Sequence, residues 1–317
     1  MEISNKPLPQ YINDFLDYLD IEKGLSSKTQ ENYFRFLNKF FLWLKKEKLE
    51  NLKPHELTPE HIFQYRLFLS RKCHNQKGQP LKKTTQNYYL IALRIFLNFL
   101  IEKNIQTLPP EKVKLIRDKS DRPVRFLTLE QLEKLFSVID VSKIQGLRDR
   151  AIFEVFFSTG MRISELVSLN RNQIKPDLKE QELTIIGKGG RMRTVYLSER
   201  ALFWLKKYLE ERKDNDPALF INHQIKSLNK SKRITPRMIE KSLKKYIVLA
   251  GLPLNITPHS LRHSFATDLL SQGVDLRVVQ EFLGHKHIAA TQIYTHVTNK
   301  KLYEIHKKFH GGRKLKA

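Results

Sequence analysis

The sequence predicts a mainly α-helical protein of two domains with a small β-hairpin. The length of 317 residues exceeds the roughly 100 to 200 residues of one typical domain. Apolar residues in the first hundred positions recur at helical spacing, and two β-prone runs flank a glycine-rich turn in the second half. The hydrophobic fraction of 40% is sufficient for packed cores, and 12 Gly and 13 Pro exclude a collagen-like chain.

The first hundred residues predict a bundle of amphipathic helices. A first helix follows from apolar residues three and four apart, from Tyr11 to Leu19. Ser27 and Gln30 predict a capping box at the start of a second helix. Further helices are expected after Thr58-Pro59, where Thr can cap and Pro suits the first helical position, and from about Thr84.

The stretch 106–125 predicts a cationic linker, because it combines three prolines with six basic residues. A new helix is expected where Thr128 and Gln131 form a capping box. The runs Glu182–Ile186 and Met192–Leu197 flank the turn Gly187–Arg191 and predict a β-hairpin. The second half is therefore expected to be mixed, with helices on both sides of the hairpin.

The charge indicates a polyanionic partner, because 57 Lys and Arg against 33 Asp and Glu leave a net charge of +24. Nucleic acid is the favoured partner, and an anionic membrane surface or a general lysine bias are the alternatives. No apolar run approaches the roughly 18 to 20 residues of a membrane span, and the N-terminus has no signal-peptide core. The lone Cys73 fits a reducing compartment, so we expect a soluble cytoplasmic protein.

Cationic side chains in two segments of the second half are candidate anion ligands. Arg162 follows Thr159-Gly160 and is expected to begin a helix, where the helix dipole disfavours a cation unless an anion binds there. Lys188 lies between glycines that allow close approach of a ligand to the backbone. The spacing around Lys188 does not match a nucleotide-binding P-loop. A surface arginine and an exposed turn lysine are the alternative interpretations.

Two further segments carry histidine and tyrosine. His259, Arg262 and His263 share one face of a helix predicted to begin at Thr257-Pro258. Zinc binding is not favoured, because the glutamate of the H-E-x-x-H motif is absent and an arginine lies between the histidines. The fourth segment contains His285, and a tyrosine with polar neighbours follows nine residues later at position 294.

Together these segments resemble the tyrosine recombinase and integrase family over almost the whole chain. The family pattern of Arg, Lys, His-x-x-Arg, His and Tyr is matched in order by Arg162, Lys188, His259 with Arg262, His285 and Tyr294. The run from His259 to Val297 is most similar to prokaryotic Xer-type site-specific recombinases. Met161 and Gly190 are small departures that remove no catalytic group.

The resemblance implies a two-domain, C-shaped DNA clamp. Residues 1–105 would form a helical, SAM-like core-binding domain, and 106–125 a basic interdomain linker. Residues 126–299 would form the α+β catalytic domain, and 300–317 a C-terminal exchange helix with a basic tail. Lys28, Lys82, Lys83 and Arg94 are the candidate DNA contacts of the first domain.

The resemblance also implies residue roles. Tyr294 would be the nucleophile, and His259 its candidate base. Arg162 and Arg262 would hold the non-bridging oxygens of the phosphate, and His285 would hydrogen-bond to it. Lys188 would protonate the departing 5′ oxygen. Glu165 and His263 would support these groups from behind, and neither metal nor any other cofactor is implied.

The predicted function is site-specific recombination through a 3′-phosphotyrosyl intermediate, in a tetramer on two DNA sites, each made of two half-sites. The partner protomers would be further copies of this chain or a paralogous recombinase. An Xer-like role in chromosome partition, by resolving chromosome or plasmid dimers, is favoured over DNA integration for a mobile element or phage. A type IB topoisomerase, a non-catalytic DNA-binding regulator and a membrane-surface protein are the rivals. None of them explains the five-part pattern, the compact first domain and the charge together.

Overall fold

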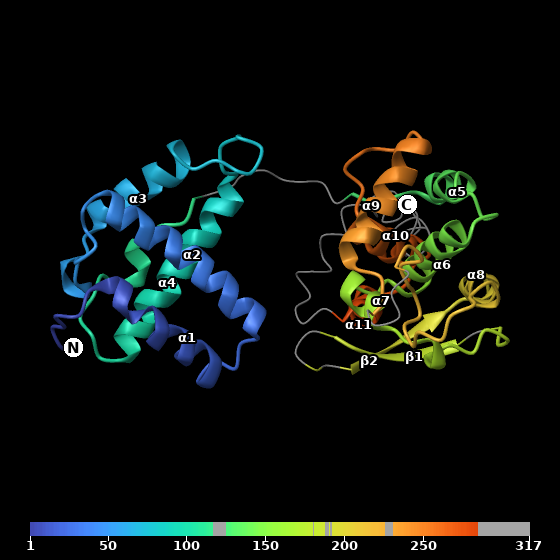
Figure 1. The fold of residues 1–317 in the computed structure, drawn as a ribbon, viewed down its shortest axis with the longest axis horizontal. Helices are drawn as coiled ribbons and strands as arrows, with labels where there is room; N and C mark the ends of the chain where they lie inside the picture. The colour runs from blue at the N-terminus through green and yellow to red at the C-terminus, as the bar shows by residue number, and fades with distance from the viewer. Residues whose placement is uncertain (117–124, 180, 188–189, 191, 226–230, 285–317) are drawn as a thin grey trace, which may run out of the picture. The chain divides into compact units, whose positions relative to one another are not determined.

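The computed structural model describes residues 1–116, 125–179, 181–187, 190, 192–225 and 231–284. The chain divides into two compact units, Met1–Asp121 and Arg122–Ala317 (Figure 1). Both are mainly helical, and the second contains the antiparallel pair β1 and β2. The predicted fold class, mainly α with a small β-hairpin, is thereby confirmed.

The first unit is built on α1 (Ile12–Ile21), α2 (Ser27–Lys46), α3 (Pro59–Arg71) and α4 (Lys83–Glu102). The 3-10 turns η1 (Leu8–Tyr11) and η2 (Pro54–Glu56) lead into α1 and α3. Helix α2 contacts α1, α3 and α4, and aromatic side chains fill the space between them. Phe40 and Tyr65, for example, meet edge to face with 4.9 Å between ring centroids. The predicted helices of this region are confirmed.

The starts of two helices in the first unit test the cap predictions. Thr58 caps α3 and its hydroxyl accepts a hydrogen bond from the His61 N–H at 3.3 Å, as predicted. The predicted capping box of Ser27 and Gln30 is wrong, because Ser26 is the N-cap of α2 and its side chain makes no cap hydrogen bond. Gln30 instead donates to the Leu25 carbonyl at 2.7 Å. The Ser26 hydroxyl instead forms a hydrogen bond with the Thr29 hydroxyl at 3.0 Å.

Residues 106–116, the first half of the predicted linker, pack on the first unit. Leu108 and Val113 are buried in its core on either side of the turn η3 (Pro110–Lys112). The Asn87 side chain donates to the Ile116 carbonyl at 2.9 Å and accepts from the Ile116 N–H at 2.8 Å. This half of the stretch is thus part of the first unit, and residues 117–124 lie outside the described residues.

The second unit surrounds one buried helix, α6 (Ile144–Thr159). It contacts α8 (Glu199–Glu210), α10 (Pro258–Ser271) and the second strand of the hairpin. Side chains on all faces of α6 are buried, and these include the charged residues Arg148, Asp149 and Glu154. Among the described residues of this unit, the remaining helices are α5 (Leu129–Ser137), α7 (Ile163–Ser168), α9 (Pro236–Leu249) and α11 (Leu276–Leu283), with the turn η4 (Arg171–Gln173).

The hairpin pairs β1 (Gln181–Ile186) with β2 (Met192–Leu197) in antiparallel register. Ile186 lies opposite Met192, so the strands agree with the predicted runs. Leu183 and Ile185 of β1 and Val195 and Leu197 of β2 enter the core of the unit. The capping box of Thr128 and Gln131 at the start of α5 is also present.

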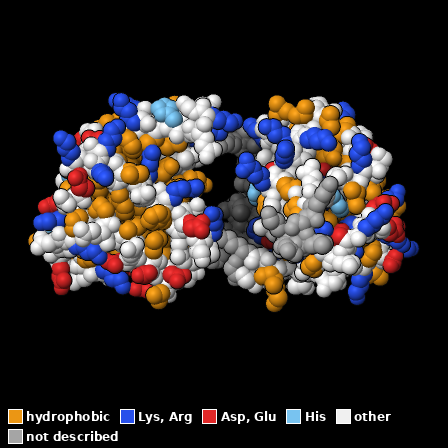
Figure 2. Space-filling view, in the orientation of Figure 1, with side chains coloured by type: hydrophobic (Ala, Val, Ile, Leu, Met, Phe, Trp, Pro, Cys, Tyr) orange, Lys and Arg blue, Asp and Glu red, His pale blue; other side chains and the backbone are white. Residues whose placement is uncertain are grey.

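The surface reflects the excess of basic residues in the sequence. Lys and Arg side chains lie on the drawn face of each unit in Figure 2, among fewer acidic ones. Within the described residues, no helix has both the length and the apolar character that a membrane span requires.

Candidate active site

The candidate site begins at the turn between α6 and α7. Gly160 ends α6 in the left-handed conformation with φ of +57°, which favours glycine. Arg162 is the N-cap of α7, and Glu165 accepts from its backbone N–H at 2.7 Å. Nη1 of Arg162 also donates to Oε1 of Glu165 at 2.9 Å. The turn therefore fixes Arg162 at both its backbone and its side chain. The helix boundary at Arg162 agrees with the prediction from the sequence.

Helix α10 contributes the second arginine. Thr257 and Pro258 start this helix as predicted, and Arg262 lies one turn into it with only 4% of its surface exposed. Its Nη1 donates to the Gly160 carbonyl at 2.6 Å, and its Nη2 donates to the Leu283 carbonyl. Arg262 thus joins the turn that carries Arg162 to the last turn of α11.

Three arginines meet the C-terminal end of α11. The consecutive carbonyls of Phe282, Leu283 and Gly284 accept from Arg193, Arg262 and Arg162, respectively. The distances are 3.0 Å for Arg193 Nε and 3.3 Å for Arg162 Nη2. Carbonyls at a helix C-terminus lack partners within the helix and carry partial negative charge, so guanidinium donors suit them. Position 285 follows directly in the chain.

Glu165 is a buried carboxylate shared by two of these arginines. Its side chain is 4% exposed and forms ion pairs with Arg162 and with Arg193. Burial alone would raise the pKa of Glu165, but hydrogen bonds from Arg193 and Arg162 lower it to about 2. The carboxylate is therefore ionised at neutral pH, and its single negative charge offsets one of the two positive charges beside it.

The two histidines of α10 are held in the neutral form. Partial loss of water and the charges of Arg262 and Arg162 lower the pKa of His259 below its ordinary value. Burial, together with His259 and Arg262, lowers the pKa of His263 to about 4. A neutral imidazole can accept a proton at physiological pH, and His259 is the more exposed of the two.

The structure brings together five of the predicted site residues, namely Arg162, Glu165, His259, Arg262 and His263. Lys188, His285 and Tyr294 lie outside the described residues, as does the predicted C-terminal segment 300–317.

The candidate DNA contacts of the first unit differ in their surroundings. Lys28 is exposed and pairs with Glu31 at 2.6 Å, and Lys82 and Lys83 are exposed where α4 begins. Arg94 is partly buried, and its Nε donates to the Pro110 carbonyl at 3.1 Å. Arg94 thus helps to hold residues 106–116 on the first unit, and all four DNA contacts stay predictions.

Arg193 is the residue that sequence reasoning missed. It lies on β2, its side chain is only 9% exposed, and it contacts both Glu165 and α11. A signal was present in the sequence, because Arg193 is in phase with the apolar Val195 and Leu197 on the core-facing side of the strand. A charged residue at such a position usually has a buried partner.

The comparisons with known proteins identify the family. Residues 125–301 match the family described as "Phage integrase family", and residues 12–104 match "Phage integrase, N-terminal SAM-like domain". The chain therefore belongs to the phage integrase family. It is an Xer-like tyrosine recombinase, an enzyme that cleaves and rejoins DNA at specific sites, as the sequence predicted.

Individual relatives agree with this assignment. Tyrosine recombinase XerD of Lacticaseibacillus casei is 38% identical over 306 residues, which cover 94% of this chain and 98% of that protein. Tyrosine recombinase XerC of Thermodesulfovibrio yellowstonii is 38% identical, with 95% and 96% covered. Among solved structures, XerH site-specific recombinase bound to difH substrate, in a pre-cleavage complex, is similar with a TM-score of 0.69 and 25% identity. The similarity covers 96% of this chain and 98% of that one.

Proposed function

We propose that Tyr294 attacks a phosphodiester of duplex DNA within the cationic cluster formed by Arg162 and Arg262. The Tyr294 oxygen forms a bond to phosphorus while the bond to the 5′ oxygen breaks, which leaves a 3′-phosphotyrosyl link. Religation reverses these bonds with a 5′ hydroxyl of another strand. The observation that carries the proposal is that Arg162 and Arg262 meet at the end of α11, with a neutral histidine beside them.

The two arginines supply positive charge where negative charge develops. Attack on the phosphate spreads charge over the non-bridging oxygens, and planar guanidinium groups that stay protonated can hold them. Arg162 retains 30% exposure of its side chain, so it is accessible to a phosphate. Glu165 and His263 support the arrangement from behind. No metal or other cofactor is needed for this charge balance.

Proton transfers complete the proposed reaction. His259 accepts the proton of the Tyr294 hydroxyl, and its lowered pKa keeps it ready to do so at neutral pH. Lys188, which follows β1 in the hairpin turn, donates a proton to the departing 5′ oxygen. His285 hydrogen-bonds to the phosphate in this scheme, a role supported by its position directly after the arginine-held end of α11.

The proposed partner is duplex DNA, and the proposed assembly is a tetramer on two sites. Structural relatives were solved in complex with DNA, including the XerH recombinase with difH and a lambda integrase dimer on a core site. Exchange between two duplexes requires four cleavages and hence four protomers. We propose that segment 300–317 docks on a neighbouring protomer. Deleting it should leave binding to one site nearly intact and should weaken paired-site complexes and recombination.

Among recombinase roles, we favour resolution of chromosome or plasmid dimers, and hence chromosome partition in the cytoplasm. The support is the identity of 33 to 38% to proteins named XerC and XerD over nearly the full chain. Recombination of a plasmid that carries two copies of the chain's own genomic site would test this role. Loss of dimer resolution in a deletion strain is the expected result, and unchanged resolution would contradict it.

The decisive experiment for the chemistry is the substitution Tyr294→Phe. The probe is a duplex that the wild-type protein selects from a random DNA pool. It carries a nick close to the cleavage position, so that the released fragment diffuses away and the covalent adduct cannot religate. Tyr294→Phe should bind this duplex with nearly wild-type affinity, since binding depends on many Lys and Arg side chains. It should form no covalent adduct that survives denaturant. Tyr196→Phe, an exposed tyrosine of the same unit, is the matched control and should form the adduct normally. An adduct from Tyr294→Phe would refute the assignment.

A further inference from the structure

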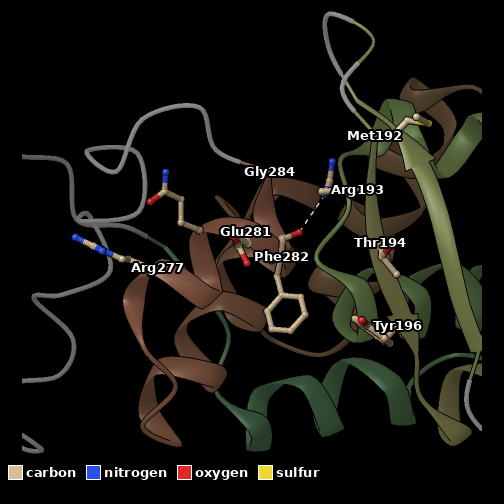
Figure 3. Close-up of a pocket in the computed structure, with 9 residues that line it drawn as sticks. Met192, Arg193, Thr194, Tyr196, Arg277, Glu281, Phe282 and Gly284 are labelled. Carbon is tan, nitrogen blue, oxygen red and sulfur yellow. Dashed lines mark hydrogen bonds between the residues drawn. The ribbon is translucent and has the colours of Figure 1, made fainter.

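A pocket of about 540 Å³ lies between β2 and α11, beside the candidate active site. Figure 3 shows its lining, with Arg193 reaching from β2 toward α11 and a hydrogen bond to the Phe282 carbonyl. Tyr196 and Phe282 meet edge to face across the pocket with 6.0 Å between ring centroids. Arg193 is therefore at the junction of two elements that each lead to a candidate catalytic residue: β2 follows the turn with Lys188, and α11 precedes His285.

All three nitrogens of the Arg193 guanidinium donate a hydrogen bond. Nη1 donates to Oε1 of Glu165 at 2.9 Å, and Nη2 donates to Oε2 at 2.7 Å. Nε donates to the Phe282 carbonyl at 3.0 Å. Such a bidentate pair fixes the carboxylate in both position and rotation. The same two oxygens of Glu165 accept from Arg162, so the orientation of Glu165 determines that of Arg162.

The close approach of Arg193 also depends on the backbone beyond α11. A Cβ at Gly284 would lie 2.8 Å from Cδ of Arg193, and the φ of +61° at this residue favours glycine. The carbonyl of the same Gly284 accepts from Arg162. Arg193 and Arg162 are consequently held by one carboxylate and by neighbouring carbonyls of one helix end.

From this geometry we propose that Arg193 is a positioning residue for DNA cleavage. It fixes Glu165, and through Glu165 it aims Arg162 at the scissile phosphate. It also ties β2 of the hairpin to the end of α11 through the Phe282 carbonyl. Arg193 does not touch the phosphate. The proposal rests on the proposed function, because it assigns Arg193 an action on the proposed role of Arg162.

The test compares Arg193→Gln and Arg193→Lys with wild type on the nicked duplex described above. Arg193→Gln should lower the rate of adduct formation at saturating DNA by about 10- to 100-fold, the size expected when hydrogen bonds to a charged group are lost. The dissociation constant for DNA should change by less than about threefold, since one of many cationic contacts is affected. Arg193→Lys should lower the rate of adduct formation at saturating DNA at least about fivefold, because an ammonium cannot form the bidentate contact and also reach the Phe282 carbonyl.

Two controls separate positioning from general damage. Arg277→Gln removes the same charge from the same pocket without a side-chain contact to Glu165, and its saturating rate should stay within about twofold of wild type. In the double variant of Arg193→Gln with Arg162→Lys, the losses should be less than multiplicative, because both act through one phosphate contact.

Specific results would overturn the proposal. The proposal fails if Arg193→Lys forms the adduct at the wild-type rate at saturating DNA. It also fails if the double variant loses the product of the two single-variant losses in adduct rate, because Arg193 would then not act through Arg162. A fall in DNA affinity with an unchanged saturating rate would show that Arg193 is a DNA contact instead. If wild type forms no adduct, the proposed chemistry itself fails. An adduct in wild type with no loss in the Arg193 variants contradicts only the positioning role.

Discussion

Replacing Gly160 by alanine should destabilise the catalytic unit by more than the backbone strain of an alanine in the left-handed conformation. The left-handed backbone, with φ of +57°, costs an alanine about 1–2 kcal/mol. A Cβ there would lie 2.3 Å from Cδ1 and 2.8 Å from Cε1 of Phe265, and overpacking of this kind costs about 1–3 kcal/mol. The sum is about 2–5 kcal/mol, or a fall in Tm on the order of 10 °C for a unit of this size.

Gly251→Ala is the matched control in the same unit. Its φ of +63° is nearly the same, and nothing lies within 4 Å of the position a Cβ would occupy. Its free energy of unfolding should therefore fall by only about 1–2 kcal/mol. Urea unfolding would be followed by tryptophan fluorescence with Trp43→Phe in every variant, so that Trp204, the other of 2 tryptophans, reports on the second unit.

Equal losses in Gly160→Ala and Gly251→Ala would refute the steric argument. A second check uses Phe265→Ala as the background, where the extra cost of Gly160→Ala should largely disappear. Because the Gly160 carbonyl accepts from Arg262, Gly160→Ala should also slow DNA cleavage under conditions where the variant is folded.

Three further predictions concern the chemistry and its pH dependence. Lys188→Ala should slow cleavage of ordinary DNA far more than cleavage of DNA with a 5′-sulfur leaving group, which needs no proton; equal losses would show that Lys188 only positions DNA. Arg162→Ala and Arg262→Ala should each lower the adduct rate at least about a hundredfold, without restoration by magnesium. Acid should destabilise the second unit in two windows. Between pH 6.5 and about 4, His263 binds a proton in the unfolded state but not in the folded state, so stability falls as the pH is lowered. Between pH 4.5 and about 2, Glu165 does the same. Urea unfolding at each pH should show a smaller lower step in Glu165→Gln, and an unchanged step would contradict the assignment.

Sequence reasoning predicted the local features well where one residue type has one physical use. The cap at Thr58, the two hairpin strands and the end of α6 at Gly160 were predicted from side-chain chemistry, β propensity or backbone conformation at a few positions. It failed at Ser27, because α2 begins with Ser26 as its N-cap and without a side-chain cap hydrogen bond. Residues 106–116 were predicted to be linker, because their prolines and charges conceal two core residues that follow no helical or strand period.

The candidate site shows the same limit. The order of Arg162, His259 and Arg262 along the chain could be recognised as a pattern, and the structure brings these residues together. Arg193 belongs to no such pattern. Its importance depends on contacts with Glu165 and α11, which are 28 and 89 residues away in the sequence. Contacts of that separation are created by the packing of β2 against the helices, which no local spacing encodes.

Because α6 is enclosed by the rest of its unit, heat and substitutions should affect the reaction centre and the surface differently. Backbone amides in a helix buried on all sides exchange with solvent only when the whole unit opens. The turn that presents Arg162 is continuous with this buried helix, so the reaction centre should persist until the unit melts as a whole. Candidate DNA contacts such as Lys28 and Lys82 are instead at the surface, where substitutions cost little stability. Surface contacts of this kind can therefore change between lineages while the buried reaction centre stays the same.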